Sequence, residues 1–286
     1  MPRTFRVSCK ANLFLRVTGR LENGYHTLHS LFVRLDEPHD EMRVSPGAPG
    51  GGLQLHCPGL PELPLDKNIV SKAYVAHSRA TGLSADLEIH LDKGIPDGAG
   101  LGGGSADAAA MLRILQEEAG QRALTEDGLR KLAVDLGADV PFFLLGSAAE
   151  ATGVGDRLTE VEPGLDDCLA LVVCPDVHVP TAWAYAALDD DAEKGYQWLT
   201  AQSEVDNGPF CLGRPRLEND FEKVVLSAFP ELRRLKEWLF QLGASGAVMS
   251  GSGAAMVALF RRERRLEAAA SALAAEGIRA YATGIF

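Results

Sequence analysis

The stretch Pro96-Asp-Gly-Ala-Gly-Leu-Gly-Gly-Gly-Ser-Ala-Asp-Ala-Ala-Ala110 contains five glycines within seven residues. It lies between an apolar run that predicts a strand, Leu87 to Leu91, and an alanine-rich run that predicts a helix. Glycine allows positive φ, and successive N–H groups that lead into a helix N-terminus carry partial positive charge. The stretch therefore predicts a phosphate-binding loop, with the Ser105 hydroxyl at the expected helix start. The alternative is a mobile loop or an irregular turn, which explains most isolated glycine clusters.

Two common phosphate-binding motifs do not fit this loop. No lysine follows the glycines, so the Gly-x-x-x-x-Gly-Lys-Ser/Thr spacing of P-loop nucleotidases is absent. Gly98-Ala-Gly100 begins a Gly-x-Gly-x-x-Gly fragment that ends at Gly103. A dinucleotide-binding fold has this fragment near the start of a βαβ unit, whereas a long, mainly β-patterned segment precedes it here. Both motifs are therefore disfavoured.

Composition limits the class of protein. The chain has 286 residues and a net charge of −11, which argues against partners held by bulk positive charge, namely nucleic acid and anionic membranes. The five cysteines include no Cys-x-x-Cys pair, which favours reduced thiols and a cytoplasmic location. The longest apolar run, Cys168 to Cys174, has the length of a strand and stops at Pro175. The N-terminus has no apolar core of a secretory signal. We expect a monomer or homodimer that binds small molecules.

Hydrophobic periodicity predicts an α+β protein whose pattern restarts after about residue 150. We expect two lobes, which we assign to residues 1–154 and 155–286. The first third alternates like a sheet, with strands expected at residues 5–9, 13–17, 31–35, 42–44, 53–55 and 87–91. Helices are expected from Asn68 to Gly82, over 108–119 and after Thr125. The second half predicts strands at 169–173, 247–249, 255–260 and 278–282, and helices after Pro180 and over 230–242 and 262–275. This order suggests helices on one side of an antiparallel sheet.

Three further features are candidates for chemistry. The turn Ser250-Gly-Ser-Gly-Ala254 could grip phosphate together with the first glycine loop, although alone it is more often a tight turn. Asp139, before Val140-Pro141, is explained either as a helix N-cap or as a general base. Lys10 lies in an apolar strand, where a lysine that faces solvent is the alternative to a buried lysine paired with a carboxylate such as Asp139.

These motifs together resemble those of the GHMP small-molecule kinases. The resemblance rests on Pro96 to Ala110, Gly137-Ala-Asp-Val-Pro141 and Met249-Ser-Gly-Ser-Gly-Ala254. Lys10-Ala-Asn-Leu-Phe-Leu15 and Gly24-Tyr-His26 are similar to the branch that phosphorylates 4-diphosphocytidyl-2-C-methyl-D-erythritol. The resemblance implies a two-lobed GHMP kinase fold, with an N-terminal lobe like ribosomal protein S5 domain 2 and a ferredoxin-like C-terminal lobe.

The resemblance also implies the reaction and the site. ATP, with Mg²⁺ bridging its phosphates, would phosphorylate the 2-hydroxyl of the cytidine-diphosphate-linked methylerythritol in non-mevalonate isoprenoid synthesis. Asp139 would accept or orient the hydroxyl proton, and Lys10 would hold Asp139 and the hydroxyl in register and offset charge. The ATP phosphates would be wrapped by Pro96, Gly98, Ala99, Gly100, Leu101, Gly102, Gly103, Gly104 and Ser105. The second substrate would be bound by Asn12, Tyr25, His26, Thr181, Tyr185, Gly251 and Gly253, with cytosine stacked between Tyr25 and Tyr185.

Other functions remain open at this point. The same family includes kinases of other small alcohols, such as mevalonate or homoserine, and the same scaffold also supports non-catalytic ligand-binding relatives. Ser8-Cys9 stand where the family usually has Pro-Ala, and the acidic Asp97 lies at the edge of the phosphate loop. The segment Asp189 to Arg216 matches no pattern that assigns it a role.

Overall fold

The computed structural model describes residues 2–59, 64–193, 210–211 and 214–285. These residues form two compact units. The first unit consists of Met1–Cys9, His39–Ile95 and Gly102–Gly146, and the second consists of Lys10–Pro38, Pro96–Leu101 and Ser147–Phe286. Two long strands, β1 (Arg3–Arg20) and β2 (His26–Pro46), each contribute residues to both units. Within the described residues, no helix has both the length and the apolar composition needed to cross a bilayer.

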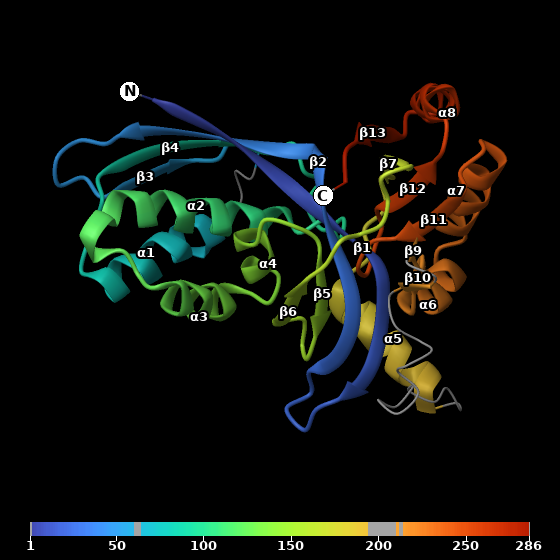
Figure 1. Cartoon of the computed structure of the whole chain (residues 1–286), viewed down its shortest axis with the longest axis horizontal. Helices are drawn as coiled ribbons and strands as arrows, with labels where there is room; N and C mark the ends of the chain where they lie inside the picture. The colour runs from blue at the N-terminus through green and yellow to red at the C-terminus, as the bar shows by residue number, and fades with distance from the viewer. Residues whose placement is uncertain (1, 60–63, 194–209, 212–213, 286) are drawn as a thin grey trace. The chain divides into compact units, whose positions relative to one another are not determined.

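The first unit combines a small sheet with four α-helices. The last part of β2 pairs antiparallel with β4 (Leu87–Asp92), and β3 (Leu53–His56) pairs parallel with β4. Leu87, Ile89 and Leu91 of β4 are buried, whereas the alternating Glu88 and His90 are more exposed. The helices of this unit are α1 (Ile69–Thr81), α2 (Gly103–Ala119), α3 (Glu126–Leu136) and α4 (Val140–Leu144). Figure 1 shows them on one side of these strands. Two short 3-10 helices, Leu65–Lys67 and Gly120–Arg122, complete this unit.

Capping residues begin α1 and α3 where the sequence predicts, whereas α2 begins at Gly103, ahead of the expected 108. The Asn68 side chain accepts a hydrogen bond from the Val70 N–H at 2.9 Å, and Gly82 ends α1 in the left-handed conformation. The Thr125 hydroxyl accepts from the Gly128 N–H at 3.2 Å. Each such cap satisfies a backbone group that the helix itself leaves without a partner.

The second unit contains a four-stranded antiparallel sheet in the order β11-β12-β7-β13. Its strands are β7 (Leu169–Cys174), β11 (Gly246–Met249), β12 (Met256–Phe260) and β13 (Arg279–Thr283). The apolar side chains of the sheet share one core with α5 (Thr181–Glu193), α6 (Phe221–Ala228), α7 (Pro230–Gln241) and α8 (Glu263–Ala275). The expected α+β organisation is therefore confirmed.

The remaining strands of the second unit are short. β5 (Ala149–Thr152) pairs with β2 and with β6 (Arg157–Glu160), and β10 (Glu218–Asn219) pairs parallel with β1. A two-residue pair, β8 (Phe210–Cys211) and β9 (Arg214–Pro215), forms a separate ribbon. None of β5, β6 and β10 is predicted by the sequence pattern, and neither is α6.

The early strands differ from the prediction in their continuity. The strands expected at 5–9 and 13–17 are parts of β1, and those expected at 31–35 and 42–44 are parts of β2. In β1 the pattern is interrupted by Lys10 and Asn12, which are nevertheless 4% and 3% exposed. Polar side chains with partners can be buried, so a polar interruption does not end a strand.

A buried charge cluster connects the end of β4 to the start of α2. Lys93 Nζ donates to Asp40 and, at 2.6 Å, to Asp107 Oδ2. Asp40 Oδ1 also accepts from the Gly94 and Ile95 N–H groups at 2.7 and 2.8 Å. Burial lowers the pKa of Lys93, but the two carboxylates outweigh it, and the pKa is raised. Burial raises the pKa of Asp107 to about 7, against the attraction of Lys93. Asp107 Oδ1 is buried and accepts no hydrogen bond from the described residues.

We expect Asp107→Asn to change the pH dependence of stability. The folded pKa of Asp107 is above its usual 3.8, so the folded state binds this proton more tightly than the unfolded state does. The contribution of Asp107 to stability is therefore largest below the unfolded pKa and is lost as pH rises toward 7. Urea unfolding between pH 4.5 and 7.5 should show the variant gaining stability relative to the parent as pH rises. A constant difference between the two proteins would contradict this prediction.

Candidate functional site

The glycine loop takes the conformation that its sequence predicts. Gly98, Gly100 and Gly102 have φ of 66°, 79° and 71°, which L side chains rarely adopt. Helix α2 begins at Gly103, so Ser105 lies in its first turn rather than before it. Gly102 supplies no side-chain cap. The first N–H groups of α2 are therefore available to an anion.

The second glycine turn packs backbone to backbone against the first loop, within the second unit. Ser250 Oγ donates to the Gly100 carbonyl at 2.8 Å, and the Ala255 N–H donates to the Ala99 carbonyl at 3.1 Å. A Cβ placed on Gly100 would lie 2.2 Å from the Ser250 carbonyl oxygen. The expected pairing of the two glycine turns is present, and it leaves no room for a side chain at Gly100.

Two polar side chains fix the conformation of the second turn. Asn219 Nδ2 donates to the carbonyls of Met249 and Gly251 at 2.6 and 2.7 Å. Thr181 is the first residue of α5, and its hydroxyl lies 2.8 Å from the Ser252 hydroxyl. The structure thus brings Thr181 together with the turn that contains Gly251 and Gly253.

Lys10 is held in a defined position in β1. Its Nζ donates to Asn12 Oδ1 at 2.7 Å and lies 4.8 Å from the centre of the Phe32 ring. Asn12 Nδ2 in turn donates to Ser30 Oγ at 2.8 Å, and the Asn12 N–H donates to Ser250 Oγ at 3.1 Å. The Lys10 N–H donates to the Leu101 carbonyl at 2.9 Å. Lys10 therefore does not face solvent, and its hydrogen bonds connect it to both glycine turns.

A second group of predicted residues gathers near the turn between β1 and β2. Tyr25 is 67% exposed, whereas the His26 ring stacks on Tyr185 with 4.6 Å between ring centres and 20° between planes. His26 Nε2 lies 2.7 Å from Asp189 Oδ1, and Arg20 pairs with the same carboxylate at 3.2 Å. A base between Tyr25 and Tyr185 would therefore share the Tyr185 ring with His26.

Asp139 belongs to the first unit and directly precedes α4. It is half-buried, its backbone is in the right-handed helical region, and its carboxylate makes no capping hydrogen bond. Pro141 is in the first turn of α4, as the sequence predicts. Asp139 therefore occupies the N-cap position of α4 without a side-chain capping hydrogen bond, and its part in the chemistry stays a prediction.

Comparison with known proteins identifies the family. The models of the GHMP kinases N terminal domain and the GHMP kinases C terminal domain match residues 68–147 and 211–279. A 4-diphosphocytidyl-2-C-methyl-D-erythritol kinase from Solidesulfovibrio magneticus is 48% identical over 279 residues, which cover 96% of this chain and 94% of that protein. The chain belongs to the GHMP kinases, in the 4-diphosphocytidyl-2-C-methyl-D-erythritol kinase family.

Solved structures agree with this family. A crystal structure of 4-(cytidine 5'-diphospho)-2C-methyl-D-erythritol kinase matches with a TM-score of 0.78 and 37% identity, over 100% of this chain and 99% of that one. A homoserine kinase from Cytophaga hutchinsonii matches with a TM-score of 0.67 and 19% identity, over 99% and 94% of the two chains. The second likeness shows the fold alone, and the expected GHMP kinase fold is confirmed.

Several residues around the glycine turns of this GHMP kinase were not singled out by their sequence. A Cβ on Gly98 would lie 3.0 Å from His178 Nδ1, so His178 lies beside the loop. Asn219 and the Ser250 hydroxyl hold the second turn, and Asp189 binds His26. Only Ser250 lies in a motif, and no spacing or periodicity marks the other three. Residues 194–209 of the unassigned segment lie outside the described residues.

We expect Gly100→Ala to destabilise the kinase by roughly 2–6 kcal/mol, because positive φ and the overlap with the Ser250 carbonyl each cost about 1–3 kcal/mol. The matched control is Gly104→Ala, whose Cβ would meet only Ile69 Cγ2 at 3.7 Å. Chemical unfolding of both variants measures the difference. Equal unfolding midpoints for the two variants would show that the close approach is not needed.

Proposed function

We propose that this GHMP kinase catalyses ATP-dependent phosphorylation of the 2-hydroxyl of 4-diphosphocytidyl-2-C-methyl-D-erythritol, giving the 2-phosphate and ADP. The observation that carries the proposal is identity of 37–48% to relatives of that name over nearly their whole length. The reaction serves non-mevalonate isoprenoid synthesis in the cytoplasm. The N-terminal lobe of the kinase spans residues 1–154 and the C-terminal lobe spans residues 155–286. The kinase is a monomer or a homodimer.

The ATP phosphates bind along the glycine loop. Positive-φ glycines let backbone N–H groups approach the phosphate oxygens, and the N-terminus of the 17-residue helix α2 adds partial positive charge. The contacts run from Pro96 through Gly98, Ala99, Gly100, Leu101, Gly102, Gly103 and Gly104 to Ser105. The uncapped first turn of α2 supports this assignment.

Ser105 fits the role of a magnesium ligand. Ser105 is half-buried, and its hydroxyl has no hydrogen-bond partner among the described residues. Magnesium takes oxygen ligands and is usually bound by one or two protein groups together with substrate phosphates. Ser105 would hold such an ion, which, when bound, neutralises charge on the phosphates.

Asp139 and Lys10 act on the hydroxyl that receives the phosphoryl group. A carboxylate that is not used as a cap can accept the hydroxyl proton, and Asp139 satisfies that condition. Lys10 supplies positive charge at a position fixed by Asn12, which offsets the charge that develops during transfer. Phosphoryl transfer depends mainly on positioning and charge stabilisation, and these two roles supply both at the hydroxyl that receives the phosphoryl group.

The cytidine-diphosphate end of the substrate binds near the turn between β1 and β2. The exposed Tyr25 ring offers a face for the cytosine, and the stacked pair His26 and Tyr185 offers a second aromatic surface and a ring nitrogen for the base edge. Asn12, Thr181, Gly251 and Gly253 contact the methylerythritol and its diphosphate, and the hydrogen bond between Thr181 and Ser252 of the second turn supports this assignment.

We expect Asp139→Asn to lower kcat by about 10²–10⁴-fold while the protein stays folded, because the amide cannot accept the proton. The control is Asp135→Asn, an exposed aspartate on α3 of the same unit. Steady-state kinetics measure the loss, and circular dichroism checks the fold. Full activity in Asp139→Asn would contradict the assigned role.

The choice of alcohol can be tested directly. Purified protein with ATP and magnesium should convert 4-diphosphocytidyl-2-C-methyl-D-erythritol, and not mevalonate or homoserine, because only the first offers a base to the aromatic residues. Mass spectrometry of ADP and the phosphorylated product reports the turnover. Turnover of mevalonate or homoserine alone would replace the proposed substrate, and no turnover of any alcohol would favour a ligand-binding role.

A further inference from the structure

Three side chains on the exposed face of the first unit's sheet converge on one point. His56 ends β3, and Glu88 and His90 lie two residues apart on β4, so they share a face. In the parallel pairing of these strands His56 lies opposite His90. Their neighbours Leu55 and Ile89 are buried on the other face. All three converging side chains are between 40% and 50% exposed.

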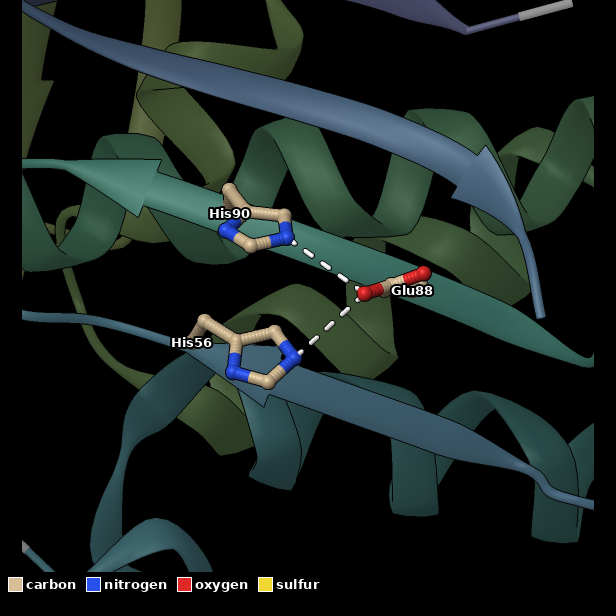
Figure 2. A group of neighbouring side chains, drawn as sticks. All are labelled: His56, Glu88 and His90. Carbon is tan, nitrogen blue, oxygen red and sulfur yellow. Dashed lines mark ion pairs between the residues drawn. The ribbon is translucent and has the colours of Figure 1, made fainter.

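The spacing of the three groups suits a bound ion. Glu88 Oε1 lies 3.6 Å from His56 Nε2 and 3.4 Å from His90 Nε2. Figure 2 shows the carboxylate facing both imidazoles. One ligand atom from each side chain lies within 4.8 Å of the others. Ligand atoms about 2.0–2.1 Å from a tetrahedral ion are roughly 3.3 Å apart. Both contacts exceed the usual hydrogen-bond length, so the groups face one another at a distance that an ion would occupy.

The surrounding charges favour a cation. On β2, Arg43 lies opposite His90, but its guanidinium donates to Asp92 at 2.6 Å and to Glu41 at 3.3 Å. Arg43 therefore pairs with Glu41 and Asp92, and its positive charge does not balance the three carboxylates of this group, which also includes Glu88. The two imidazoles stack with their ring centres 4.5 Å apart and 19° between planes. Each neutral ring offers a nitrogen lone pair to a cation.

We propose that His56, Glu88 and His90 form a binding site for a zinc-class divalent ion. Two imidazoles and one carboxylate are ligands that Zn²⁺ takes, whereas Mg²⁺ prefers a set made only of oxygens. Three protein ligands leave a fourth position for water. The ion joins β3, the last strand in the order β2-β4-β3, to its neighbour β4. Its role is to stabilise this sheet, apart from the phosphoryl-transfer chemistry.

The test is a titration of the full-length, EDTA-treated protein with Zn²⁺ in the presence of excess Mg²⁺, by calorimetry. We expect one equivalent to bind to the parent. His56→Gln, Glu88→Gln and His90→Gln should each weaken binding at least about tenfold, the size of effect seen even for groups that only support metal ligands. Zn²⁺ should also raise the melting temperature of the parent and not that of His90→Gln.

Cys57→Ser is the matched control, because Cys57 follows His56 directly and thiolates bind zinc strongly. This variant should keep the affinity and the melting shift of the parent. Unchanged affinity in the three ligand variants would overturn the site, as would loss of binding in Cys57→Ser alone. Absence of Zn²⁺ binding to the parent would also overturn it.

Discussion

The close approach of Gly100 to the Ser250 carbonyl is the constraint on which the rest of the second unit's site depends. The two residues are 150 positions apart, and only a residue without Cβ lets their backbones meet. The Ser250 hydroxyl accepts from the Asn12 N–H while it donates to Gly100, so one side chain joins β1 to both turns. The Asn12 side chain then positions Lys10. A chain of hydrogen bonds thus runs from a turn near residue 250 to the ammonium near the N-terminus.

The same arrangement resolves a difficulty of charge. The chain carries a net charge of −11, while ATP and a cytidine diphosphate are themselves anions. In the function that we propose, the attraction comes from groups that act over short distances: backbone N–H groups in the glycine loop, the start of α2, and Lys10. Such groups are effective because they are fixed before the ligand binds, and an ammonium with little exposure to water loses little of its field to solvent screening.

Periodicity in the sequence predicts single elements well and contacts between distant elements poorly. Helices α1 and α3 follow from an apolar stripe with Asn68 or Thr125 before it, since both signals lie within one element. The four-residue strands β5 and β6 are not predicted, because so short an alternation of apolar and polar residues is not distinctive. Lys10 and Asn12 seemed to interrupt a strand because their partners, among them Ser30 and Leu101, are elsewhere in the chain.

The candidate site shows the same limit. The glycine loop, Asp139 and Lys10 stand out because their residue types are unusual in their local pattern. Other residues do not stand out in this way: Asn219, Asp189 and the buried pair Lys93 and Asp107. A polar residue in a sequence does not reveal whether its partner is water or a buried group. Their importance depends on partners between 14 and 163 positions away, which only the fold brings near.

The two cation sites that we propose in the first unit differ in the ligand groups that the fold exposes at each place. At the start of α2 the available groups are backbone N–H groups and one hydroxyl, which suit phosphate and a hard ion that arrives with it. On the exposed sheet face the alternation of β4 presents Glu88 and His90 on the side opposite to the buried Ile89 and Leu91. Imidazole there selects a softer ion, and the buried layer of the strand separates it from the core on which α2 packs. On these two proposals, a zinc ion at this face would leave a magnesium ion at the glycine loop unaffected, since ligand type and strand face would keep the two ions apart.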